Sequence, residues 1–217
     1  IRSIAFHLNA RGLAPGSKIA VAANNGISSC LTVLGIIYAG HIALPLNLVA
    51  GSKIIAYTLD HSETALIFTA DDCEKLISEA LSDFEKEIEI IKLDSQLGPI
   101  WEKEALNEKF VKKGNVSAEE IAVIMYTSGT TGNPKGVMLS HGNFTAMLGS
   151  LGQIFSMGST DRVLSVLPLH HTFEFSCGLL MPLSQGTGII YLDEITGDRL
   201  SYGLREGQVT AMVGVPA

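Results

Sequence analysis

The sequence contains little charge, few cysteines and a single tryptophan. Charged residues make up 17% of its 217 residues and hydrophobic residues 47%, a composition typical of a protein with a large core and not of a disordered chain. Acidic residues outnumber basic ones by 22 to 15, so the basic surface of a general nucleic-acid-binding protein is not expected. The three cysteines are far apart and odd in number, so no disulfide framework or metal-ligand spacing is indicated, and reduced thiols in a cytoplasmic protein are the simplest interpretation.

Residues 19–52 contain no Asp, Glu, Lys or Arg, yet they do not read as a membrane span. Asn24, His41, Pro45 and Asn47 divide the stretch into pieces of strand and helix length. A buried strand–helix–strand unit of a parallel sheet explains it better than a single helix of ~20 apolar residues. The first residues also lack the basic segment, apolar core and cleavage site of a signal peptide.

Short β-branched runs alternate with amphipathic helical patterns along the whole chain. This alternation predicts an α/β fold with layered, mostly parallel sheets and helices on both faces. One helix is expected to begin with Asp71 and Asp72 as caps, and another with Ser140 as its cap. The helix that follows Ser140 is expected to face the core with Phe144, Met147, Leu148, Leu151 and Phe155. Strands are expected at 18–23, 43–46, 65–69, 89–93, 121–127, 163–167, 188–192 and 209–213.

A charged segment divides the chain. Residues 94–120 carry a charge cluster and only a short helical pattern around Trp101, Leu106 and Phe110, which indicates a solvated surface excursion. We therefore expect a first α/β half at 1–93 and a second at 121–217. Both ends lack the caps or polar tails of a natural boundary, so the sequence reads as a fragment of a longer protein.

The segment 126–136 reads Tyr-Thr-Ser-Gly-Thr-Thr-Gly-Asn-Pro-Lys-Gly and lies between two apolar, strand-like runs. Its glycines permit positive φ and close approach of the backbone, whose N–H groups can form an anion-binding concavity. Lys135 adds a positive charge suited to phosphate, and Pro134 stiffens the loop. Neutral donors come from four hydroxyls, those of Thr127, Ser128, Thr130 and Thr131.

Two other interpretations of this loop fit the sequence less well. A flexible surface turn is the usual explanation of such composition, but it does not account for the lysine between two buried-type strands. A Walker A loop requires a lysine directly after glycine and then a helix. Here Lys135 follows proline and precedes Gly136 and a strand-like run, which disfavours that motif.

The segment resembles the signature of the adenylate-forming superfamily, which includes acyl-CoA synthetases, luciferases and peptide-synthetase adenylation domains, and it fits that pattern at every position. The resemblance extends to residues 34–47 and to the Pro-Leu-His-His sequence at 168–171. It implies attack of a carboxylate on the α-phosphorus of ATP, release of pyrophosphate and transfer of the acyl group to the thiol of CoA. The fold implied is part of the large N-terminal domain, and the family's C-terminal domain is absent from the sequence.

The resemblance also implies roles for individual residues. Lys135 and His171 are the candidate catalytic residues, and Thr127 is the candidate ligand of Mg²⁺. His171 alone matches the family pattern, since His170 falls one position early; without the match, a histidine satisfied within a turn would be the simpler explanation. The ATP phosphates would be bound by Thr127, Ser128, Gly129, Thr130, Thr131, Gly132, Lys135 and His171.

Residues 170–175 resemble most the bacterial long-chain fatty-acyl-CoA synthetases, which favours a fatty acid as substrate and leaves room for a peripheral membrane contact. Phe173, Glu174 and Phe175 either contribute to an acyl pocket or begin a helix that packs its aromatic side inward. The nearby apolar residues either line a lipid tunnel or belong to the core; they are Leu179, Leu180, Met181 and Ile189.

Two alternatives stay open. An acyl-AMP ligase would load a carrier protein in place of CoA, and a truncated nucleotide-binding module would lack catalysis. We expect the fragment alone to be inactive, because the family's later metal-ligand glutamate, ribose-binding aspartate and catalytic lysine do not occur in it.

Overall fold

The computed structural model describes residues 1–84, 87–93, 116–127 and 133–215. The chain forms two compact units, one made of residues 1–24 and 28–141, the other of residues 25–27 and 142–217. Within the described residues no helix is long and apolar enough to cross a membrane. The predicted helical pattern around Trp101 lies outside these residues.

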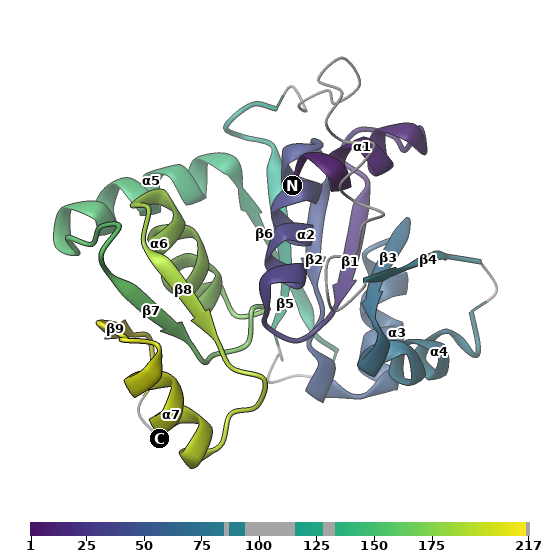
Figure 1. The fold of residues 1–217 in the computed structure, drawn as a ribbon. Helices are drawn as coiled ribbons and strands as arrows, with labels where there is room; N and C mark the ends of the chain where they lie inside the picture. The colour runs from purple at the N-terminus through teal and green to yellow at the C-terminus, as the bar shows by residue number, and fades with distance from the viewer. Residues whose placement is uncertain (85–86, 94–115, 128–132, 216–217) are drawn as a thin grey trace. The chain divides into compact units, whose positions relative to one another are not determined.

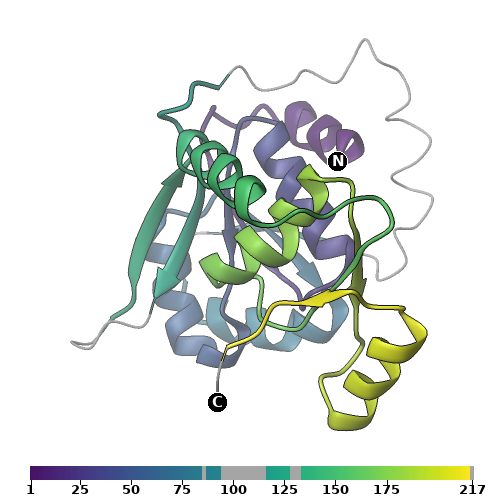
Figure 2. The same ribbon diagram turned by 90° about the vertical axis from the view of Figure 1, so that its left-hand side faces the viewer.

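A six-stranded sheet with the order β4-β3-β1-β2-β5-β6 forms the centre of the first unit. Five strands run parallel, and β6 at the edge is antiparallel to β5 (Figures 1 and 2). The strands are β1 (Lys18–Ala22), β2 (Ile42–Pro45), β3 (Leu66–Ala70), β4 (Glu89–Leu93), β5 (Ile121–Thr127) and β6 (Lys135–Ser140).

Helices cover both faces of this sheet, as the sequence pattern predicts. One face packs against α3 and α4 in a cluster that includes Ala20, Leu44 and Ile67 from the strands and Ile55 and Ile77 from the helices. The opposite face is covered by α1 and α2, which lie in front of the strands in Figure 1. The helices are α1 (Arg2–Ala10), α2 (Ile27–Tyr38), α3 (Ser52–His61) and α4 (Glu74–Leu81), with 3-10 turns η1 (Leu48–Ala50) and η2 (Asp71–Cys73).

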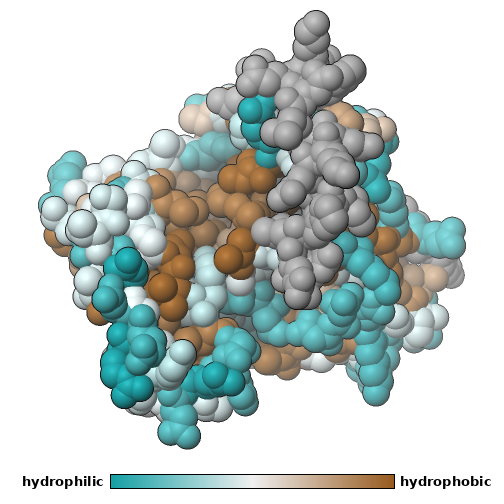
Figure 3. Space-filling model, viewed as in Figure 1, coloured by the Kyte–Doolittle hydropathy of each residue, from teal (hydrophilic) through white to brown (hydrophobic). Residues whose placement is uncertain are grey.

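The second unit contains a smaller parallel sheet with the order β8-β7-β9. Its outer strands are only partly covered, and large apolar side chains such as Ile195 and Tyr202 are exposed. Hydrophobic residues also reach the surface on the face drawn in Figure 3. The elements are α5 (His141–Ile154), β7 (Arg162–Ser165), the π-helix η4 (Glu174–Leu180), α6 (Met181–Ser184), β8 (Gly188–Tyr191), α7 (Gly197–Glu206) and β9 (Ala211–Met212).

Two helix details differ from the sequence prediction. Asp71 and Asp72 form the 3-10 turn η2 and do not cap α4, whose first turn has no side-chain cap. In α5 only Phe144 is fully buried, and Phe155 lies beyond the helix end at Ile154 and is 47% exposed. The period-3.6 pattern correctly predicts a helix there, but it does not show that most of its apolar residues stay partly exposed.

Candidate active site

The phosphate-loop sequence connects β5 and β6, so its two ends are fixed by the pairing of these strands. Thr127 pairs with Lys135 and Tyr126 with Gly136 in the antiparallel register. Directly opposed residues point to the same face of a sheet, with Cβ atoms roughly 5 Å apart. The structure therefore brings Thr127 and Lys135 side by side, and both are exposed.

The loop itself lies largely outside the described residues. Five predicted phosphate-binding positions fall there: Ser128, Gly129, Thr130, Thr131 and Gly132. Of the described loop residues, Asn133 is exposed and Pro134 is buried. The roles of the five positions therefore remain predictions.

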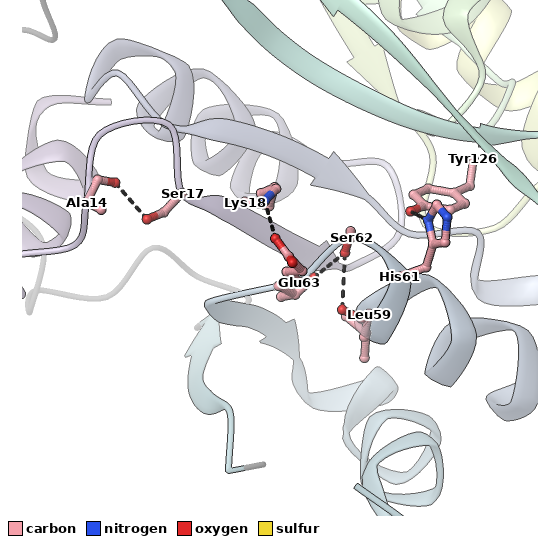
Figure 4. A network of polar contacts seen from close by, with 9 residues as sticks. Ala14, Ser17, Lys18, Leu59, His61, Ser62, Glu63 and Tyr126 are labelled. Carbon is pink, nitrogen blue, oxygen red and sulfur yellow. Dashed lines mark hydrogen bonds and ion pairs between the residues drawn. The ribbon is translucent and has the colours of Figure 1, made fainter. Parts of the chain in front are cut away.

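The other face of the hairpin is anchored by Tyr126. A methyl group added at Gly136 would lie 3.2 Å from the Tyr126 ring, so only glycine lets the ring pack so closely over β6. The Tyr126 hydroxyl lies 2.7 Å from Nδ1 of His61 at the end of α3 (Figure 4), and the His61 ring stacks on Tyr57 with centroids 5.2 Å apart. Burial, and to a lesser degree Tyr57, raises the pKa of Tyr126, which keeps the phenol neutral.

Sequence reasoning did not identify His61, because nothing in its local pattern marks it. It lies at the exposed C-terminal end of an amphipathic helix, where a histidine is favourable for electrostatic reasons alone. The adjoining turn is fixed by Ser62, whose hydroxyl bonds to the Leu59 carbonyl, and by the ion pair of Lys18 with Glu63 at 3.0 Å (Figure 4). Only the three-dimensional pairing shows that α3 supports the hairpin.

A cavity of about 370 Å³ adjoins the hairpin in the first unit. It is lined by Pro45, Leu46, Asn47, Val49, Ala50, Ile54, Ile55, Thr58, Tyr126 and Pro134. A larger cavity of about 650 Å³ between α3 and α4 includes no hairpin residue. Size alone therefore does not identify the site, and the chemistry of the hairpin is the better guide.

The second predicted site segment is a turn in the second unit, in which the His171 N–H donates to the Pro168 carbonyl at 3.0 Å. His171 is exposed, whereas His170 is only 8% exposed. Burial, with a smaller effect of His171, lowers the pKa of His170 to about 4, so it is neutral at pH 7. Of the two imidazoles, that of His171 is therefore the more accessible to solvent, and its catalytic role stays a prediction.

The residues after the turn pack as a helix start. Phe175 is fully buried and lies 5.2 Å from Phe144, centroid to centroid, whereas Phe173 is 49% exposed. Glu174 is buried, with only 1% of its surface exposed. Leu179 and Met181 are also buried, so core packing accounts for these two; a role in binding an acyl chain stays a prediction.

Of the candidate residues, Thr127 and Lys135 share the first unit and His171 belongs to the second. Among the described residues, no group of three or more His, Cys, Asp or Glu side chains is placed to hold a metal ion. The Thr127 hydroxyl is an oxygen ligand of the kind that Mg²⁺ accepts, and that ion commonly keeps water and phosphate oxygens around it. The exposed Thr127 therefore fits Mg²⁺ only as one ligand among phosphate and water.

Comparison with known proteins places these features in a family. The chain is 31% identical over 181 residues to the sulfoacetate–CoA ligase of Cupriavidus necator, which covers 83% of this chain and 36% of that protein. It is 28% identical to the 2-succinylbenzoate–CoA ligase of Bacillus cereus over 96% of this chain and 40% of that protein. The chain thus spans well under half the length of these curated relatives.

Solved structures agree on the fold. The ATP-bound MatB of Rhodopseudomonas palustris is 25% identical and superposes with a TM-score of 0.82 over 99% of this chain and 42% of that one. The inhibitor-bound N-terminal domain of FACL13 from Mycobacterium tuberculosis is 22% identical, with a TM-score of 0.87 over 99% of this chain and 54% of that one. The model of the AMP-binding enzyme family matches residues 1–217, and the chain therefore belongs to this family.

Proposed function

We propose that the chain is part of an ATP-dependent acid–thiol ligase that activates a carboxylic acid as an acyl adenylate. The observation that carries the proposal is the register of β5 and β6, which sets Lys135 beside Thr127 at the mouth of a glycine-rich loop. Membership of the AMP-binding enzyme family supports the nucleotide as ligand. The relatives' names support CoA as the acceptor.

In the first step, a carboxylate oxygen of the acid attacks the α-phosphorus of ATP. The bond from this phosphorus to the bridging oxygen breaks, and pyrophosphate leaves with the bonding electrons. Negative charge grows on the leaving group, so a fixed positive charge lowers the barrier. Lys135 supplies that charge to the β- and γ-phosphates, and the Thr127 hydroxyl and the loop N–H groups orient them.

His171 is the second proposed catalytic residue. Its exposed imidazole can donate to a phosphate or carboxylate oxygen, and it helps to place the incoming acid against the α-phosphorus. In the second step the CoA sulfur attacks the acyl carbonyl and AMP leaves. When bound, Mg²⁺ would neutralise phosphate charge, with Thr127 as the proposed protein ligand in this chain.

A fatty acid is the proposed substrate, because residues 170–175 resemble the corresponding segment of the long-chain branch of the family. The relatives are named for sulfoacetate and 2-succinylbenzoate, two polar acids, so the substrate must be found by assay. We place the reaction in the cytoplasm, since three cysteines so widely spaced in the sequence suit reduced thiols. Contact with a membrane surface would accompany a lipid substrate only.

The test is ATP–pyrophosphate exchange by the full-length gene product with a panel of fatty, aryl and sulfonated acids. Exchange that depends on one class of acid supports acid activation and names the substrate class. The acyl acceptor is then identified by adding either CoA or an acyl carrier protein to the reaction with the preferred acid. Absence of acid-dependent exchange in folded full-length protein would leave a non-catalytic nucleotide-binding module as the better description.

A further inference from the structure

The backbone just before the two histidines is held by one distant side chain, that of Asn25. Its Nδ2 donates to the Leu167 carbonyl at 2.6 Å, and its Oδ1 accepts from the Leu169 N–H at 2.8 Å. These two bonds lie on either side of Pro168, which itself has a fixed φ and no N–H. The amide of Asn25 thus clamps both peptide groups that flank this proline.

The clamp continues into a buried carboxylate. Asn25 Nδ2 also donates to Ser165 Oγ at 3.1 Å, and that hydroxyl donates to Glu174 Oε1 at 2.5 Å. The Glu174 carboxylate accepts a further bond from the Leu167 backbone. Both N–H and C=O of Leu167 are therefore taken up by this network of Asn25, Ser165 and Glu174.

Glu174 is held in place by close packing as well as by its bonds. It is 1% exposed, and a methyl group added at Gly178 would lie 2.2 Å from its Oε1. Its Oε2 is buried and has no hydrogen-bond partner among the described residues. Burial raises the pKa of Glu174, so the charged form is costly and is compensated by Ser165 and Leu167.

The segment that Asn25 restrains, residues 167–169, is connected to His171 by one backbone hydrogen bond. The His171 N–H donates to the Pro168 carbonyl, and the His171 carbonyl accepts from the Phe175 N–H at 3.0 Å. The position of the His171 backbone is thus set by Pro168 on one side and by the helix that carries Glu174 on the other. An exposed imidazole on a backbone restrained in this way loses little entropy when it meets a ligand.

We propose that Asn25, acting with Ser165 and Glu174, is a positioning residue that aims His171 at the reacting acid and nucleotide. The inference rests on the proposed acid activation and on the role of His171 in it. Asn25 itself does not touch the reacting groups. Its effect should therefore appear in the chemical step and should pass entirely through His171.

The test uses Asn25→Asp in the full-length protein. The change keeps the size and the Oδ1 acceptor but replaces the Nδ2 donor, so the bonds to the Leu167 carbonyl and to Ser165 are lost. Asn24→Asp is the matched control, because Asn24 is exposed and bonds instead to Asp72 at 2.9 Å. For Asn25→Asp we expect kcat of pyrophosphate exchange to fall about tenfold with the KM for ATP within about threefold, and for Asn24→Asp neither constant to change by more than about twofold.

A double-mutant cycle distinguishes an effect of Asn25 that acts through the position of His171 from a general disruption of the structure. In the His171→Ala background, Asn25→Asp should cost less than about twofold, because the residue it positions is gone. An equal loss in both backgrounds overturns the inference, as does a His171→Ala variant with wild-type kcat. Wild-type protein without exchange refutes the proposed function, a separate failure that removes the inference with it. If Asn25→Asp does not fold, Ser165→Ala takes its place. This variant removes one hydroxyl of the network, and the same changes in kcat and KM are expected in the two backgrounds.

Discussion

The β5–β6 hairpin and the turn at residues 168–171 each hold a candidate catalytic side chain, but they fix its position by different means. In the hairpin, Thr127 and Lys135 are brought together by strand pairing, and their side chains stay exposed. In the turn, the backbone before His171 is fixed by Asn25, which lies 142 residues before Leu167 in the sequence, and by a buried glutamate. A local motif can therefore reveal the first site, whereas only the folded chain reveals how the second is held.

The largest effect is expected from removing the charge of the hairpin. Lys135→Ala leaves the β5–β6 backbone pairing intact but removes the cation that we propose stabilises the departing pyrophosphate. We expect kcat/KM for pyrophosphate exchange to fall about 100-fold. Lys75→Ala is the control, since this lysine is 90% exposed on α4 and forms only a long i,i+4 pair with Glu79. Equal values of kcat/KM for the two variants would show that Lys135 does not contribute to binding the phosphates.

The turn at residues 168–171 should be most sensitive to a substitution that disturbs the packing around Glu174. Gly178→Ala would place a methyl group within 2.7 Å of three Glu174 carboxylate atoms, so the buried network must shift. We expect a loss of about 1–3 kcal/mol in unfolding free energy, measured by urea denaturation of the full-length protein. Gly149→Ala on α5 meets nothing within 4 Å and should gain up to ~1 kcal/mol. Equal effects of the two substitutions would show that Glu174 does not pack as described.

A pH titration of stability sharpens the comparison, because the buried His170 belongs to the turn and has no counterpart in the hairpin. Burial lowers the pKa of His170 to about 4, below its ordinary value of 6.5. Between these values the unfolded chain binds a proton that the native state does not, so stability falls as the pH falls. The loss is of order 1–3 kcal/mol, and His170→Gln should remove it from the difference between pH 7.5 and 4.5 in urea denaturation. His41, whose pKa burial also lowers, would keep its own contribution; an unchanged slope in the variant would contradict the assignment to His170.

The smallest effect is expected where the hairpin meets α3. Tyr126→Phe keeps the ring on Gly136 and removes only the bond to His61. Since that pair is exposed, the cost should be about 0.5 kcal/mol, seen as a roughly twofold rise in the KM for ATP. In a His61→Ala background the same substitution should have no further effect. Independent losses would mean that the phenol acts elsewhere.

The sequence was sufficient for the layers and for most of the strands, but β6 was expected only as a strand-like run after the loop, and its antiparallel pairing with β5 was not predicted. The ranges expected for β4 and β5 match the structure, because β-branched apolar runs mark strands strongly, both in the buried β5 and in the mostly exposed edge strand β4. Burial was harder to predict: Phe155 fits the helical period yet is exposed, since α5 ends at Ile154 and periodicity alone does not show where a helix stops. The partnerships of His61 with Tyr126 and of Asn25 with Leu169 were not predictable, because single polar residues carry no periodic signal.

We propose above all that the β5–β6 hairpin serves attack of a carboxylate on the α-phosphorus of ATP. The most direct measurement incubates the full-length protein with its preferred acid and ATP labelled at the α-phosphate, without CoA, and separates the labelled products. We predict acid-dependent formation of acyl-AMP with release of pyrophosphate, lost in Lys135→Ala. Labelled ADP with an acyl phosphate, or no acid-dependent product, would contradict the claim.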